Sequence, residues 1–150
     1  MLSKFEIFPN KGLGDLAFGT DMVSFVDKYG EPEEVQNFDD DEELRTTVLH
    51  YWKEGISVFF VGLSGPILAG VEIDHQDISL FDKKILGISE EELISFMKQH
   101  GYENFETDFE DADKRLSYDV GMMDFFFRDD KLIYMNFGVL VDEDGNIETV

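Results

Sequence analysis

The sequence predicts an α+β fold made by a tandem duplication, in which each copy packs one helix on a small antiparallel β-sheet. Two short amphipathic helical stretches recur along the chain, and each is followed by extended segments with alternating polarity. We expect one domain over all 150 residues, with repeats at about 13–74 and 80–141. A short N-terminal arm at 1–12 and an acidic C-terminal tail at 142–150 would flank them. The repeats would pack either as one continuous sheet or as separate lobes.

The first helix is expected over 22–29, where apolar residues recur on one side. Thr20 or Asp21 is suited to cap its N-terminus, because a short polar side chain there can accept a hydrogen bond from a free backbone N–H. Gly30 suits the left-handed conformation that commonly ends a helix. The spacing therefore predicts a helix of about two turns.

The second helix is expected over 90–100 and ends at Gly101. Ser89 followed three residues later by Glu92 forms the capping-box pattern, in which each side chain bonds a backbone N–H of the first turn. The neighbouring glutamates also suit the positive end of the helix dipole.

Strands are expected after each helix, because these segments are rich in Thr, Val, Phe and Tyr. An offset of about 66 residues relates the two sets and aligns Trp52 with Tyr118 and Gly55 with Gly121. The alternative is that two amphipathic strands resemble each other by period-two alternation alone. The expected ranges are 45–52, 55–61 and 67–74 in the first half, and 115–119, 122–128 and 132–141 in the second.

Alternation along the strands assigns side chains to two faces of the sheet. The core face would carry Ile67, Ala69, Val71, Ile73, Ile133, Met135, Phe137 and Val139. The other face would carry Leu68, Gly70, Glu72, Leu132, Tyr134 and Asn136, with Asp124 and Phe126 from a neighbouring strand. Aromatic side chains among polar groups are typical of protein-binding surfaces. The alternative is that both faces are covered and that Phe126 and Tyr134 belong to the core.

The charge of the chain excludes several function classes. It has 34 Asp and Glu against 12 Lys and Arg, a formal net charge of −22. Nucleic acids and anionic membranes need a basic patch, so neither is an expected partner. The chain has no cysteine, and no apolar run approaches the length of a membrane span. The first eight residues are too short and polar for a signal peptide, which predicts a cytoplasmic protein.

Motifs for catalysis are absent from the sequence. No glycine-rich phosphate loop or nucleophile elbow is present. His75 lies beside Asp74 and Asp77, which could make it a metal ligand or a base, although such a group is more often a solvated turn. We therefore predict no catalytic residue, no metal and no cofactor.

One pattern resembles a known family. Leu16-x-Phe18-Gly19-Thr20-Asp21, a helix, Gly30-x-Pro32, and a strand with Trp52 followed by Gly55-Ile56-x-Val58 resemble the module of β-lactamase-inhibitor-protein-like domains and of a small outer-membrane assembly lipoprotein. The resemblance implies a tandem-repeat α+β protein with a concave sheet that grips another protein. The small acidic chain is also similar, as a class, to bacterial immunity proteins.

These observations favour a non-enzymatic protein-binding protein, of the immunity or inhibitor type, that neutralises a basic partner. The expected anchors are the aromatic residues Trp52, Phe126 and Tyr134. The acidic run Asp39, Asp40, Asp41, Glu42 and Glu43 would orient the partner, or would be only a solvated loop. One alternative is a small ligand-binding or metal-dependent hydrolase-like domain with a pocket between the repeats, using His75. Another is a homodimer that pairs its sheets.

Overall fold

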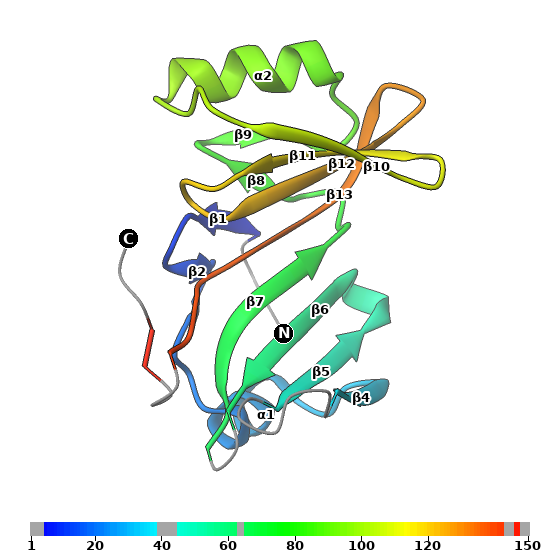
Figure 1. Ribbon diagram of the computed structural model, residues 1–150. Helices are drawn as coiled ribbons and strands as arrows, with labels where there is room; N and C mark the ends of the chain where they lie inside the picture. Colours follow the sequence, from blue (N-terminus) through cyan, green and yellow to red (C-terminus); the bar gives the residue numbers. More distant parts are fainter. Residues whose placement is uncertain (1–4, 39–44, 63–64, 143–145, 148–150) are drawn as a thin grey trace.

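The computed structural model describes residues 5–38, 45–62, 65–142 and 146–147. Strands account for 48% of these residues and helices for 16%. They form an eight-stranded sheet and a five-stranded sheet, with two α-helices (Figure 1). The predicted fold class, a tandem α+β duplication of a helix on a small sheet, is therefore wrong, because the protein is mostly β.

The large sheet is antiparallel and has the order β10-β11-β12-β13-β7-β6-β5-β4. Its strands are β4 (Glu34–Phe38), β5 (Thr46–Tyr51), β6 (Ile56–Val61), β7 (Ile67–Ile73), β10 (Glu106–Glu110), β11 (Asp113–Tyr118), β12 (Met123–Arg128) and β13 (Lys131–Gly138). The strands β4 to β7 and β10 to β13 therefore form two halves that meet where β7 pairs with β13.

The small sheet has the order β3-β2-β1-β8-β9. Its strands are β1 (Glu6–Phe8), β2 (Gly12–Leu13), β3 (Leu16–Ala17), β8 (Ser79–Leu80) and β9 (Lys83–Lys84). Glu6 and Ile7, which the sequence analysis treats as part of an arm, pair here with Ser79 and Leu80, and Ile7 joins the core. Strands of two or three residues are too short to show a polarity pattern, so sequence reasoning missed this sheet.

The edge strands β4 and β10 were also missed, because all their residues are exposed and their sequences lack an apolar alternation. Both edges carry acidic residues, including Glu34 and Glu106. Charged side chains on an edge strand discourage pairing with another chain. These strands and the small sheet raise the strand content above the prediction.

Both predicted helices are confirmed as α1 (Met22–Tyr29) and α2 (Glu90–Gln99). The Asp21 carboxylate caps α1 by accepting a hydrogen bond from the Ser24 N–H, and the Ser89 hydroxyl accepts one from the Glu92 N–H. Gly30 ends α1 with a φ of 93°. A one-turn 3₁₀ helix, η1 (Trp52–Glu54), connects β5 to β6.

The six strands expected from alternation are confirmed as β5, β6, β7, β11, β12 and β13. Two β-bulges change the predicted faces, with register shifts between Phe59 and Phe60 and between Phe126 and Phe127. Each bulge inserts one extra residue, Ala69 in β7 and Ile133 in β13, so the residues before it lie on the face opposite to the one that simple alternation predicts. Leu68 and Leu132, predicted on the outer face, are consequently buried in the core.

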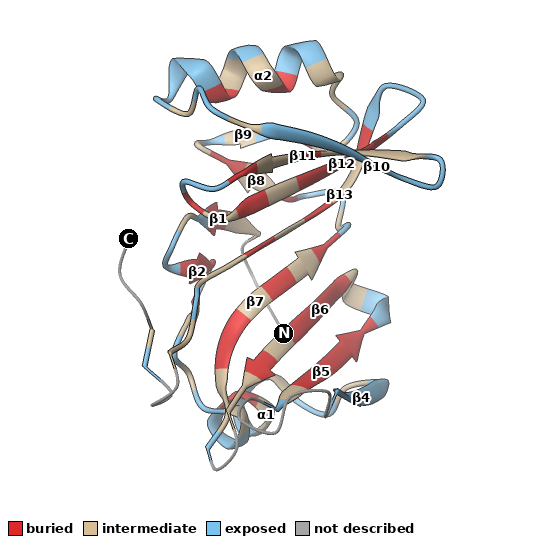
Figure 2. Ribbon diagram, viewed as in Figure 1, coloured by how far each residue is buried: buried red, intermediate tan, exposed pale blue. Residues whose placement is uncertain are grey.

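One hydrophobic core lies against a single face of the large sheet. Phe25 of α1 packs on Tyr51 and Phe60, while Leu93 and Met97 of α2 are buried in the same cluster. The small sheet contributes its buried apolar residues to it (Figure 2). Neither helix covers the opposite face, which we call the open face. No helix among the described residues is long and apolar enough to cross a membrane.

Candidate functional site

A row of directly paired residues crosses all eight strands on the open face. In strand order from β4 to β10 it consists of Glu34, His50, Ser57, Glu72, Asn136, Asp124, Ser117 and Glu106. Residues paired directly across neighbouring strands project to the same side of a sheet. We call this line of eight polar side chains the polar row.

Two members of the row are buried and bonded to each other. The His50 ring lies with Nε2 at 2.8 Å from the side-chain oxygen of Gln36 and Nδ1 at 2.6 Å from the Ser57 hydroxyl. Both ring nitrogens thus have a side-chain partner, and the two contacts hold the imidazole in one orientation.

Trp52 stacks on that imidazole, with ring centroids 4.2 Å apart and planes within 10°. The side chain is nevertheless 57% exposed, and its backbone N–H donates to a Glu33 carboxylate oxygen at 3.0 Å. A large ring that is both positioned and exposed can contact a partner without losing much conformational freedom on binding.

Tyr134 of β13 stacks on Phe126 of β12, with ring centroids 4.3 Å apart and an interplanar angle of 9°. Phe126 is only 4% exposed, whereas Tyr134 is half-buried. Burial raises the pKa of the Tyr134 hydroxyl, and the negative charge of Glu72 adds to this effect. Phe126 therefore supports one face of the Tyr134 ring, and Tyr134 is the member of the pair that a partner could contact.

A pocket of about 250 Å³ brings Trp52 and Tyr134 together although they are far apart in the sequence. We call it the aromatic-acid pocket; it is lined by Trp52, Gly55, Ile56, Ser57, Glu72, Ile73, Asp74 and Tyr134. A Cβ at Gly55 would lie 2.5 Å from a carboxylate oxygen of Asp74, so glycine lets this carboxylate lie against the η1 turn.

The pocket has a strongly negative character. Burial raises the pKa of the Glu72 carboxyl, and the nearby Asp74 raises it further. Within the described ranges, no hydrogen bond or ion pair reaches the Glu72 carboxylate. The site thus holds two acids whose charges are not balanced by a protein cation.

Three acids in the other half of the open face are paired with arginines. Arg115 pairs with Asp108 and Glu110 at 3.1 and 3.3 Å, and Arg128 pairs with Asp113 at 2.7 Å. Glu72 and Asp74 of the aromatic-acid pocket have no such pairing within the described residues.

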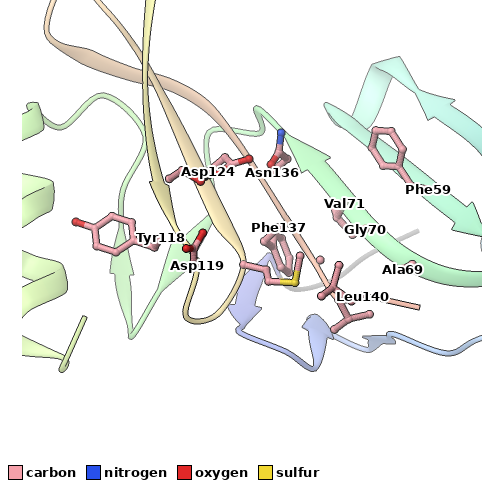
Figure 3. A pocket seen from close by; sticks show the side chains of 14 residues that line it. Phe59, Ala69, Gly70, Val71, Tyr118, Asp119, Asp124, Asn136, Phe137 and Leu140 are labelled. Carbon is pink, nitrogen blue, oxygen red and sulfur yellow. Dashed lines mark hydrogen bonds between the residues drawn. The ribbon is translucent and has the colours of Figure 1, made fainter. Parts of the chain in front are cut away.

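A second, larger hollow of about 630 Å³ lies where β7 meets β13 (Figure 3). Phe59, Asp124, Asn136 and Leu140 are among the residues that line it. The two strands approach closely because Gly70 pairs with Gly138, and a side chain at Gly138 would collide with the Ala69 backbone.

The predicted anchors thus occupy one area, with Trp52 and Tyr134 in the same pocket and Phe126 behind Tyr134. The predicted acidic residues Asp39, Asp40, Asp41, Glu42 and Glu43 lie outside the described residues. Sequence reasoning did not select Glu72 and Asp74 as site residues. Alternation places Glu72 on the outer face, but the pocket that it shares with Tyr134 depends on the pairing of β7 with β13.

The histidine considered for catalysis lies elsewhere. His75 stacks on Phe5 at 3.8 Å, and its Nδ1 accepts a hydrogen bond from the Asp77 N–H at 3.0 Å. No group of three or more His, Asp or Glu side chains in the described part of the chain is placed to hold a metal ion.

Comparisons with known proteins do not assign the chain to a family. No protein-family model and no curated protein matches the chain. Among solved structures, it is similar to an extracellular protein containing a SCP domain from Bacillus anthracis str. Ames, with 13% identity and a TM-score of 0.48. The similarity covers 84% of this chain and 44% of that protein.

The observed fold corrects the resemblances inferred from the sequence. The chain is not a tandem helix-on-sheet module of the β-lactamase-inhibitor-protein-like or lipoprotein kind, since strands make up 48% of its described residues and form two sheets. The class-level similarity to immunity proteins is likewise not found. The short pattern around Phe18 and Gly30 reflects a capped helix followed by a strand, which many folds contain.

Proposed function

We propose that this protein is a non-enzymatic binding protein that engages a basic protein partner through the open face of its large sheet. The observation that carries the proposal is the aromatic-acid pocket, in which exposed Trp52 and half-buried Tyr134 flank the unpaired acids Glu72 and Asp74. Aromatic side chains dominate binding energy at protein interfaces, and uncompensated acids favour a cationic partner. By covering a basic surface of its partner, the protein would act as an inhibitor.

The overall charge supports the same proposal. A net charge of −22 produces a long-range field that steers cationic proteins toward the chain and accelerates their encounter. Such steering weakens as salt screens the charges. Binding through the open face should therefore weaken with increasing salt.

The experiment is affinity capture from a lysate of the source cell at low and at moderate salt, with bound proteins identified by mass spectrometry. Wild-type protein is compared with Trp52→Ala and Glu72→Gln. The matched control is Glu91→Gln, which removes one exposed acid from α2, on the covered side of the sheet.

We expect a basic protein that is retained by the wild type and by the Glu91→Gln control, and that is lost from both open-face variants. Its retention should fall at moderate salt. Equal retention on all variants would show that the partner binds elsewhere and would contradict the proposal, as would the absence of any basic partner.

A second candidate function is the binding of a small ligand in the hollow between β7 and β13. Its volume of about 630 Å³ lies within the range of small-molecule sites. Native mass spectrometry of the purified protein would test it. A ligand of constant mass that is lost from a Gly70→Val variant would support this candidate.

A further inference from the structure

We infer that the aromatic-acid pocket receives one arginine side chain of the basic partner. The inference rests on the proposed function and specifies the chemistry of its central contact. Trp52, Tyr134, Glu72 and Asp74 provide the recognition, with Ser57 on the pocket wall.

The size of the pocket favours a single side chain. About 250 Å³ is smaller than the sites that hold drug-sized ligands, which begin near about 300 Å³. A helix or strand of a partner could not enter it, but one long side chain projecting from such an element could. The occupant is therefore expected to be a residue of the partner and not its backbone.

The charges of the pocket favour a cation. The Glu72 carboxylate lies half-buried beside Asp74 and makes no ion pair within the described ranges. Its negative charge also acts on the hydroxyl of Tyr134. A cationic group between these acids would remove their repulsion and replace the hydration that burial has cost Glu72.

The aromatic side chains favour arginine over lysine. A guanidinium is planar, stacks on aromatic rings and binds carboxylates through two parallel hydrogen bonds. Among aromatic side chains, an indole attracts a cation most strongly. The indole of Trp52 is also held in place by its stack on His50. An ammonium group offers neither the stacking nor the two-point contact, and it is more strongly hydrated.

The protein carries a built-in probe for this contact, because Trp52 is its one tryptophan. The full chain is titrated with N-acetyl-arginine methylamide at constant ionic strength, and the fluorescence of Trp52 is recorded. The neutral isostere N-acetyl-citrulline methylamide and the lysine analogue are titrated in parallel. The same compounds are titrated into N-acetyl-tryptophanamide, which measures the collisional quenching of a free indole, and this signal is subtracted.

We expect a saturable signal with the arginine compound and binding at least about tenfold weaker with citrulline, since charge-assisted hydrogen bonds are lost. Glu72→Gln should also weaken arginine binding about tenfold, while Glu91→Gln leaves it unchanged. The lysine analogue should bind more weakly than arginine.

A signal that does not saturate, or one that is equal for arginine and citrulline, would overturn the inference. Equal binding of the lysine analogue would overturn the choice of arginine, and an unaffected Glu72→Gln variant would overturn the role of Glu72. If the arginine compound fails to bind while a partner is still captured through the open face, this inference fails and the proposed function stands. If arginine binds but no partner is captured, the proposed function fails instead.

Discussion

The two halves of the large sheet share one strand arrangement but handle charge on the open face in different ways. In the β10 to β13 half, Arg115 and Arg128 pair with three acids on the same face. In the β4 to β7 half, His50 and Ser57 bond each other in the polar row, and Glu72 has no ion pair within the described residues. The same backbone therefore supports acids paired with arginines on one side and an unpaired acid that can attract a cation on the other.

The halves also differ in the environment of two equivalent tyrosines. Tyr51 ends β5 and Tyr118 ends β11, and both are buried in the core. The Tyr51 hydroxyl donates to the Gly30 carbonyl at 2.8 Å, whereas the Tyr118 hydroxyl has no partner among the described residues. Burial raises the pKa of both hydroxyls to about 12, and Glu31 and Glu33 add to the shift at Tyr51. Substitutions at matching positions in the two halves can therefore test each of these differences.

The largest effect is expected from the aromatic anchors. Phe126→Ala should lower the free energy of unfolding by about 3–5 kcal/mol, because removing this buried ring leaves a cavity next to Tyr134. Trp52→Ala should cost less than about 1 kcal/mol, since its side chain is largely exposed. Urea unfolding of both variants measures this difference. Equal losses of unfolding free energy would contradict the distinction between Phe126 as a buried support and Trp52 as an exposed contact.

The next effect concerns the polar row. Ser57→Ala leaves the Nδ1 of buried His50 without its hydrogen-bond partner and should cost about 1–3 kcal/mol. Ser117→Ala removes the corresponding bond to Asp124, which is half-buried and can be solvated by water, so it should cost less than about 1 kcal/mol. Thermal unfolding at neutral pH compares the two. A larger loss for the Ser117 variant would contradict the view that the His50–Ser57 contact is the more costly of the two to remove.

The two tyrosines provide a finer comparison. Tyr51→Phe should cost about 1 kcal/mol, because the Gly30 carbonyl loses its donor. Tyr118→Phe should be neutral or slightly stabilising, since it removes a buried hydroxyl that has no partner in the described part of the chain. Denaturant titrations of the pair test this. A clear destabilisation by Tyr118→Phe would mean that its hydroxyl does have a partner in solution.

The smallest effect concerns the pH dependence of stability at Glu72. Folding raises the pKa of this carboxyl, so its protonated form is favoured in the folded state. Its favourable contribution is present at low pH and is lost as the pH rises through the raised pKa. Glu72→Gln should therefore increase Tm by about 1–3 °C at neutral pH and leave it unchanged in acid, where Glu72 is protonated.

The control for this experiment is Asp113→Asn, which removes the carboxylate that pairs with Arg128. It should lower Tm at neutral pH, because the Asp113 side chain, which is only 13% exposed, loses a two-point ion pair with Arg128. A destabilised Glu72→Gln protein at neutral pH would show that Glu72 has a cationic partner, and would remove the contrast between the halves.

The candidate site could be predicted only in part from the sequence. Trp52, Phe126 and Tyr134 were selected because aromatic residues stood among polar ones in an alternating pattern. The pocket that joins Trp52 to Tyr134 depends on the pairing of β7 with β13, which brings together segments from the two halves of the chain. No local pattern specifies that pairing, so the acids Glu72 and Asp74 could not be recognised as their neighbours.

The sequence by itself determined the two capped helices and the six strands with apolar alternation, because capping and side-chain periodicity act over a few residues. Only the tertiary structure decided the short strands of the small sheet, the exposed edge strands and the two bulges that bury Leu68 and Leu132. These features arise from pairing between distant segments and from the packing of one shared core. The protein is consequently mostly β, whereas the local sequence signals predict a repeated unit of one helix on a small sheet.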